Sequence, residues 1–365
     1  MEAGIVGLSY IGKTTLFNAL TALDVERGVG GPAGRPNLGV VNVPDPRLAT
    51  INRYVETKKI VYATLQLVDV AGLVAGASKG EGLGNRFLSH LRRVDALLHV
   101  VRCFDDPGVP HVDGSVDPVR DVEAVETELM LADLEQVEGM TGKARKQART
   151  GDRDAKLRLE VIEACHVALS EGRAIASLDD GVMATADAKQ VVRALALLSA
   201  KPVLYVANVG DSDLAGDNEA ARALRAMARG RDGIVVPICA KLEEELTALD
   251  PSEQAEMLEA LGLREPALPV LARATYDLLG LHSFFTCGPK EIRAWPIPKG
   301  STAPVAAGTI HSDIQRGFIR AEVYGVDDLE QCGGEQAIRA AGRMRVEGKS
   351  YTVQDGDICH YLFNV

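Results

Sequence analysis

The stretch Gly7-Leu8-Ser9-Tyr10-Ile11-Gly12-Lys13-Thr14 has the pattern G-x-x-x-x-G-K-[ST] and decides the fold that we expect. It follows a short apolar run, Ala3–Val6, and leads into a helical pattern over Thr15–Leu23. Glycines in this pattern let backbone N–H groups curl around a phosphate chain at a helix N-terminus. We therefore predict that Ser9 to Thr15 contact the phosphates of a nucleotide. Lys13 would face the β- and γ-phosphates, and the Thr14 hydroxyl would be a Mg²⁺ ligand.

Other short apolar runs predict further strands of the same sheet. They are Thr64–Val68, Ala96–Val101, Val203–Ala207 and Ile234–Ile238. Continuous apolar strands separated by helical patterns are typical of a parallel sheet that is covered on both faces. We therefore expect a doubly wound α/β domain.

An acidic motif follows the strand predicted at Thr64–Val68. Asp69-Val70-Ala71-Gly72 places a carboxylate at a strand end, where it can hold Mg²⁺ beside the phosphate loop. The Gly72 amide would face the γ-phosphate. Lys13, Thr14, Asp69 and Gly72 are thus the residues predicted to act on the phosphates, and Thr14 and Asp69 are the predicted metal ligands.

Two later strands end in residues that suit the base of a nucleotide. Asn208-Val209-Gly210-Asp211 ends one strand, and Cys239-Ala240-Lys241 ends the next. GTPases read guanine at these places with Asn-Lys-x-Asp and a Ser-Ala-Lys loop. A carboxylate accepts hydrogen bonds from N1–H and N2–H of guanine, whereas adenine offers an acceptor at N1. We predict that Asn208, Val209, Asp211, Cys239, Ala240 and Lys241 contact the base, although Val209 stands at the lysine position.

The pattern changes twice along the chain. Apolar residues recur at helical spacing in two blocks between residues 121 and 200, which predicts a helical hairpin with a turn near Gly151, inserted into the α/β domain. From about residue 279, dense Gly/Pro punctuation and alternating runs at Phe318–Tyr324 and Ile358–Phe363 predict a small α+β module. The expected domains are therefore 1–120 with 201–278, 121–200, and 279–365.

The composition is that of an ordinary soluble protein. Of 365 residues, 46% are hydrophobic, and 40 basic against 51 acidic residues give a net charge of −11. This charge excludes a generally basic nucleic-acid coat, and no DNA partner is expected. The six cysteines lie far apart, as expected of reduced thiols in a cytoplasmic protein. No apolar run approaches the roughly 18 residues of a membrane helix, so no membrane contact is expected.

Three segments together resemble the YchF/Obg-like ATPase family of P-loop NTPases. They are residues 7–15, the string from Asp69 to Asn85 (DVAGLVAGASKGEGLGN), and the ending Asp355-Gly356-Asp357 to Phe363-Asn364-Val365. The resemblance runs from end to end. It implies a nucleotide-binding G domain, an inserted helical hairpin and a C-terminal TGS module of β-grasp type. It also implies binding and slow hydrolysis of ATP and GTP, and association with ribosomes in the cytoplasm.

The chain departs from the family's pattern at three places. Tyr10 stands where the phosphate loop usually has Asn, and Ala33 aligns with the usual switch I Thr. Asp211 replaces the Glu of the Asn-x-x-Glu base motif, which is linked to a preference for ATP. ATP and GTP both remain candidates. Two functions also remain open, a slow NTPase switch and a nucleotide-binding interaction protein with little or no hydrolysis.

Residues 143–158 form the turn region of the predicted hairpin and are strongly basic. Seven basic side chains stand against two acidic ones, a net charge of +5 within a chain of −11. We predict that this tip contacts the phosphates of ribosomal RNA. The alternative is a solvated helical face without a ligand.

Overall fold

The structure, a computed structural model, describes residues 1–21, 37–69 and 88–364. The chain divides into two compact units. Unit 1 comprises residues 1–39 and 66–268, and unit 2 comprises residues 40–65 and 269–365. Each is described by itself.

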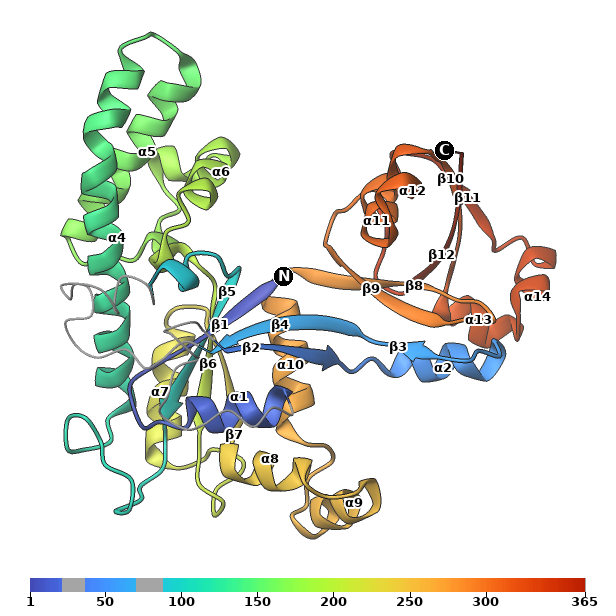
Figure 1. The fold of residues 1–365 in the computed structure, drawn as a ribbon, viewed down its shortest axis with the longest axis horizontal. Helices are drawn as coiled ribbons and strands as arrows, with labels where there is room; N and C mark the ends of the chain where they lie inside the picture. The colour runs from blue at the N-terminus through green and yellow to red at the C-terminus, as the bar shows by residue number, and fades with distance from the viewer. Residues whose placement is uncertain (22–36, 70–87, 365) are drawn as a thin grey trace. The chain divides into compact units, whose positions relative to one another are not determined.

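Unit 1 contains a six-stranded sheet in the order β2-β4-β1-β5-β6-β7 (Figure 1). Its strands are β1 (Glu2–Val6), β2 (Asn37–Val43), β4 (Ala63–Asp69), β5 (Ala96–Arg102), β6 (Val203–Asn208) and β7 (Ile234–Ile238). Residues 40–43 of β2 and 63–65 of β4 are counted with unit 2. The pairs β4–β1, β1–β5, β5–β6 and β6–β7 are parallel. The five predicted strands are thus confirmed. Every residue of β5 is buried, as expected of a strand covered on both faces.

Helices of unit 1 pack on this sheet. They include α1 (Lys13–Thr21), α7 (Glu219–Arg229), α8 (Ala240–Thr247) and α9 (Pro251–Ala260), and α10 (Ala267–Leu278) begins at its end. The core beside β6 joins Tyr205 and Ala207 to Ala221 and Leu224 of α7 and Leu242 of α8. The phosphate-loop motif connects β1 directly to α1, in the strand–loop–helix context that the motif requires.

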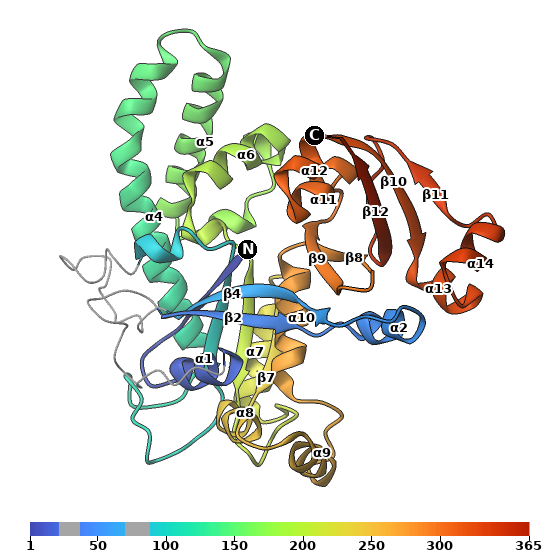
Figure 2. The ribbon, with the colours of Figure 1, turned by 45° about the vertical axis from the view of Figure 1, so that its right-hand side comes forward.

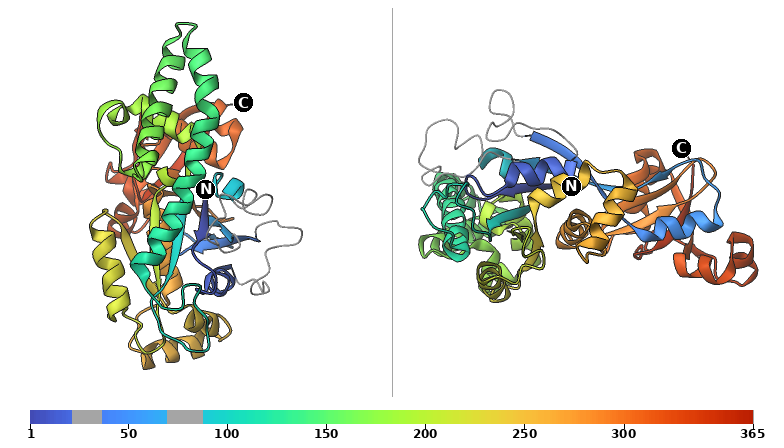
Figure 3. Two further views of the ribbon diagram at one scale, coloured as in Figure 1. Left: turned by 90° about the vertical axis from the view of Figure 1, so that its left-hand side faces the viewer. Right: turned by 90° about the horizontal axis from the view of Figure 1, so that it is seen from below.

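The inserted hairpin is present and consists of α4 (Pro118–Ala148) and α5 (Arg153–Ser170), which run side by side in all views (Figures 1, 2 and 3). Asp117 caps α4, and Asp152 caps α5 by accepting a 2.8 Å hydrogen bond from Ala155 N. Gly151 takes a φ of +88°, so the turn lies where the sequence predicts it. The smaller elements η3 (Ile175–Ser177), η4 (Gly181–Ala184), α6 (Ala186–Leu195) and η5 (Leu198–Ala200) complete this part.

Unit 2 contains a mixed sheet in the order β11-β10-β12-β8-β9-β3. Its strands are β3 (Ile60–Val61), β8 (Leu281–Thr286), β9 (Ile292–Pro298), β10 (Phe318–Gly325), β11 (Arg345–Glu347) and β12 (Asp357–Phe363). Its helices are α2 (Pro46–Tyr54), α11 (Ala303–Ile310), α12 (Ser312–Arg316), α13 (Val326–Cys332) and α14 (Glu335–Ala340). The two alternating runs of the sequence form β10 and β12, which pair antiparallel.

Apolar cores cover both faces of the sheet of unit 2. Because neighbouring residues of a strand point to opposite faces, each strand contributes side chains to both cores. Phe284, Val323 and Cys359 pack with the alanines of α11. Phe285, Tyr324 and Ile358 lie in a second core with residues of α2, α13 and α14 (Figure 2). This arrangement explains the alternating runs of apolar residues that marked β10 and β12 in the sequence.

The two units do not follow the expected domain boundaries: residues 121–200 fall within unit 1, and residues 269–278 fall within unit 2. Residues 40–65 group with the C-terminal residues and not with the rest of 1–120. Leu48, Ile51 and Leu65 share a core with Phe285 and Ile292, contacts of long sequence separation that no local pattern reveals. In the described part of the chain, no helix combines the length and apolar character needed to cross a bilayer.

Candidate functional site

The phosphate loop has the backbone conformation that its glycines permit. Gly7 and Gly12 have φ of +142° and +93°. A Cβ on Gly7 would lie 2.5 Å from Val100 O, and one on Gly12 would lie 2.4 Å from Asn208 Nδ2. Both glycines are therefore required by positive φ and by close packing. Tyr10 also has a positive φ, +62°, and its ring is exposed.

Lys13 and Asp69 are buried together at the start of α1 and the end of β4. Lys13 Nζ donates a hydrogen bond to Leu8 O. Burial lowers the pKa of Lys13 to about 8, against the attraction of Asp69. Burial raises the pKa of Asp69, although hydrogen bonds from Asn37 and Thr14 and the charge of Lys13 oppose this rise. The result is a desolvated cation beside a carboxylate and a hydroxyl, which are the groups that a phosphate chain and its Mg²⁺ require.

Asn208 joins the phosphate loop to the loop after β7. Its Nδ2 donates a 2.8 Å hydrogen bond to Ile11 O, and its Oδ1 accepts a 3.1 Å hydrogen bond from Ala240 N. The side chain is buried, so both bonds are shielded from water. Asn208 is predicted to contact the base, but in this structure its amide mainly holds two loops together.

The other residues predicted for the base differ in exposure. Val209 lies in the apolar core beside β6, with only 2% of its surface exposed. Asp211 and Lys241 are exposed. Cys239 is buried, and this burial raises the pKa of its thiol. Of the residues predicted for the base, Asp211 and Lys241 are thus the ones with exposed polar side chains.

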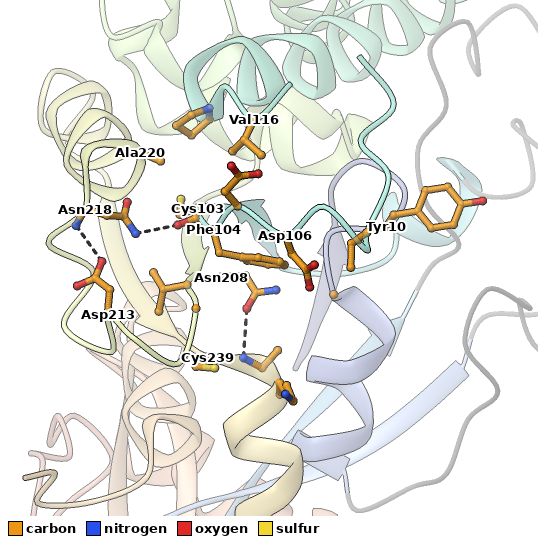
Figure 4. A pocket seen from close by; sticks show the side chains of 18 of the residues that line it. Tyr10, Cys103, Phe104, Asp106, Val116, Asn208, Asp213, Asn218, Ala220 and Cys239 are labelled. Carbon is orange, nitrogen blue, oxygen red and sulfur yellow. Dashed lines mark hydrogen bonds between the residues drawn. The ribbon is translucent and has the colours of Figure 1, made fainter. Parts of the chain in front are cut away.

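All these loops line one cavity of unit 1, with a volume of about 1620 Å³ (Figure 4). Its lining includes Ser9, Tyr10, Gly12, Lys13, Thr14, Thr15, Asp69, Asn208, Val209, Asp211, Cys239, Ala240 and Lys241. The structure therefore brings these predicted residues together. Ile11 is buried in the core and contributes its carbonyl to Asn208, and the Tyr10 ring points away from the other labelled side chains. Gly72, Ala33 and the string after Asp69 lie outside the described residues.

A further loop between β5 and α4 lines the cavity and was missed in the sequence. It contributes Phe104, Asp105, Asp106 and Asp117, among others. The buried Arg102 shapes it by donating to the carbonyls of Phe104 (3.1 Å), Asp106 (3.0 Å) and Val109 (2.9 Å). No local sequence signal marks this loop, because the strand order that puts β5 between β1 and β6, with their carboxyl ends at one edge of the sheet, belongs to the tertiary structure.

Comparisons with known proteins agree with this geometry. Residues 2–133 match the family profile described as 50S ribosome-binding GTPase, and residues 281–364 match the YchF-GTPase C-terminal family, described as a protein of unknown function. The chain is 45% identical over its full length to proteins named ribosome-binding ATPase YchF from Escherichia coli O157:H7 and from Bacillus subtilis strain 168. The alignments cover 99% and 100% of those proteins.

A solved structure is similar over the same length. The Schizosaccharomyces pombe YchF GTPase superposes with a TM-score of 0.85 at 35% sequence identity, covering 99% of this chain and 97% of the fission yeast chain. The resemblance found in the three sequence segments thus extends to the fold of the whole chain. This chain belongs to the YchF family of P-loop NTPases.

Proposed function

We propose that this chain is a nucleotide-dependent switch that binds and slowly hydrolyses ATP and associates with the ribosome in the cytoplasm, with GTP as the alternative substrate. The observation that carries the proposal is the large cavity at the carboxyl edge of the sheet, where the buried Lys13 and Asp69 lie at one end and exposed polar side chains lie at the other. The names of the relatives, ribosome-binding ATPase, support the substrate and the partner.

The phosphate end of the cavity would hold the triphosphate. Lys13 supplies a positive charge that the protein has already desolvated, so its attraction for the β- and γ-phosphates is weakly screened. Thr14 and Asp69 lie together and fit Mg²⁺, which would neutralise part of the phosphate charge when bound. Backbone N–H groups of the loop at the start of α1 add further donors. Water would attack the γ-phosphate and give nucleoside diphosphate and inorganic phosphate.

The base end would accept adenine or guanine through Asp211 and Lys241. The Asp211 carboxylate can accept from the exocyclic N6–H₂ of adenine or from N1–H and N2–H of guanine. The rim carries further acids, among them Asp105 and Asp106. Because Asp211 is exposed, its contact with either base is screened by water, and base selectivity is expected to be small.

The tip of the hairpin is the candidate contact with ribosomal RNA. Lys143, Lys146, Arg149, Arg153 and Lys156 are exposed there. Arg145 is partly neutralised by Glu163, at 3.0 Å, and Asp152 is engaged in capping α5. The tip therefore presents exposed cations, which suits the phosphates of RNA.

A single-turnover assay with purified protein, ATP or GTP and Mg²⁺, with and without ribosomes, tests the proposed activity. The wild-type chain should release phosphate slowly, and ribosomes should change that rate. Lys13→Ala serves as the inactive control. Phosphate release no faster than that of Lys13→Ala under both conditions would replace the enzyme proposal with the binding-only function.

Charge reversal tests the proposed RNA contact. The triple variant Lys146→Glu, Arg149→Glu, Arg153→Glu should co-sediment with ribosomes more weakly than wild type, and the difference should shrink at high salt. A matched control reverses the exposed Lys58, Arg222 and Lys349, which changes the net charge equally but outside residues 143–158. Unchanged co-sedimentation of the first variant, or an equal loss in both, would contradict a specific role for the tip.

A further inference from the structure

Four polar side chains of unit 2 converge at a point far in sequence from the nucleotide cavity. Cys287 follows β8, Tyr324 lies on β10, Glu335 is the first residue of α14, and His360 lies on β12. Tyr324 and Ile358 are in the core beneath α13 and α14, and His360, two residues after Ile358, points to the same face of the sheet. The cluster therefore lies between this face and the start of α14.

The contacts in the cluster centre on one carboxylate oxygen. Glu335 Oε1 lies 2.7 Å from His360 Nε2, 2.6 Å from the Tyr324 hydroxyl and 3.9 Å from Cys287 Sγ. Cys287 Sγ is 3.3 Å from the same hydroxyl. The ligand atoms of Cys287, Glu335 and His360 all lie within 4.8 Å of one another. Three chemically different metal ligands from three separate elements thus meet in one small volume.

From these positions, we propose that Cys287, Glu335 and His360 bind a divalent transition metal of the zinc class. Thiolate, imidazole and carboxylate are the ligands that Zn²⁺ takes in proteins, at about 2.3, 2.0 and 2.1 Å. Tetrahedral bonds of those lengths place imidazole and carboxylate atoms about 3.4 Å apart, and thiolate and carboxylate atoms about 3.6 Å apart. The observed separations are 2.7 Å for His360 and Glu335 and 3.9 Å for Cys287 and Glu335. The first pair must therefore open, and the second must close, to admit the ion.

The charges and the access route suit such an ion. A thiolate and a carboxylate balance the two positive charges, and the histidine binds as a neutral ring. When the metal binds, the Cys287 thiol releases its proton to solvent as the sulfur–metal bond forms. The side chains of Glu335 and His360 are 37% and 33% exposed, so an ion can enter from water, which would take the fourth position.

One neighbour would support the ligands. The buried Tyr324 hydroxyl donates to Glu335 and would orient its carboxylate. Glu322 lies opposite His360 in the β10–β12 ladder but is engaged by Arg339. Binding would link α14 to β12 and to the end of β8, so the metal should stabilise unit 2 without changing the nucleotide cavity.

Cobalt(II) titration of the full-length, nucleotide-free protein tests this site. Wild type should bind one equivalent with thiolate-to-cobalt charge-transfer absorption, which Zn²⁺ removes by displacement. The thiolate signal separates this site from His111, Asp113 and Asp121, a second cluster without sulfur. Cys287→Ser should lose the absorption. Cys332→Ser, which changes another half-buried thiol of unit 2, should retain it.

Milder variants keep the test valid if Cys287→Ser folds poorly. His360→Gln changes a partly exposed side chain, and its cobalt affinity should fall by about 100-fold or more, whereas Tyr324→Phe should cost about tenfold. Zn²⁺ should also raise the melting temperature of wild type and not of His360→Gln. A wild type without thiolate absorption, or absorption that survives unchanged in His360→Gln, would overturn the proposal and leave the cluster as a hydrogen-bonded network.

Discussion

The two ends of the nucleotide cavity are built in different ways. The phosphate end comes mostly from one continuous segment, residues 7–15, in which Lys13 is 7% exposed and is attracted by the charge of Asp69. The base end comes from three loops, after β5, β6 and β7, and its polar side chains Asp211 and Lys241 are exposed. A buried charge is weakly screened and an exposed one is strongly screened. The phosphate end should therefore supply most of the affinity and the base end a smaller, adjustable selectivity.

The largest effect is expected at the phosphate end. Lys13→Ala should weaken binding of a non-hydrolysable ATP analogue by about 100-fold or more, because it removes a desolvated, charge-assisted contact worth about 3 kcal/mol. Lys241→Ala, at the exposed base end, is the matched control and should weaken binding of the same analogue only a fewfold. Calorimetric titration measures both. Equal losses in the two variants would contradict the difference between the ends.

Substitution of Asn208 tests whether this side chain connects the phosphate end of the cavity to the base end. Asn208→Ala removes the hydrogen bonds to Ile11 O and from Ala240 N, and should lower the free energy of unfolding by about 1–3 kcal/mol. Loss of the loop's support should also weaken triphosphate binding by about tenfold. Denaturant unfolding and calorimetric titration check the two effects.

Asn218→Ala provides the comparison for Asn208. Asn218 also bridges two elements, donating to Cys103 O and capping α7 through Ala221 N, but only at the base end. Asn218→Ala should lower the free energy of unfolding by a similar amount and leave the binding of inorganic triphosphate nearly unchanged. If Asn208→Ala and Asn218→Ala affect triphosphate binding equally, Asn208 does not link the ends.

Affinity should also depend on pH through Lys13. Burial lowers the pKa of Lys13 in the nucleotide-free protein to about 8. The side chain is therefore mostly protonated near pH 7, as phosphate binding requires, and it loses this proton as the pH rises through 8. Affinity should therefore fall by about tenfold between pH 7 and pH 9. Circular dichroism over the same range verifies that the fold persists. A constant affinity across this range would show that the lysine is not desolvated as the structure has it.

The smallest effect is expected at Asp211. Asp211→Ala should weaken binding of the GTP analogue more than that of the ATP analogue, because the carboxylate can accept two hydrogen bonds from guanine. Since the side chain is exposed, the ratio of the two affinities should change by less than about fivefold. Calorimetric titration of both analogues gives that ratio. A much larger change would mean that Asp211 is enclosed when nucleotide binds.

The sequence predicted most of what is local. The motif from Gly7 to Thr14, the five strands of unit 1 and the turn at Gly151 were all found from spacing and composition, and the structure confirms them. Asp69 was placed correctly beside Lys13 because a strand end followed by D-x-x-G has a known relation to the phosphate loop. The hydrogen bonds by which Asn208 joins two loops were not predicted, because its partners are distant in sequence by 197 and 32 residues.

The sequence by itself determined the nucleotide-binding fold and the phosphate end of the cavity, because both depend on periodicity and on a contiguous loop whose glycines have no substitute. Only the tertiary structure showed the Arg102-shaped loop at the cavity, the grouping of residues 40–65 with the C-terminal sheet, and the meeting of Cys287, Glu335 and His360. Each of these joins residues from separate elements. Their proximity follows from strand order and register, which no single stretch of sequence contains.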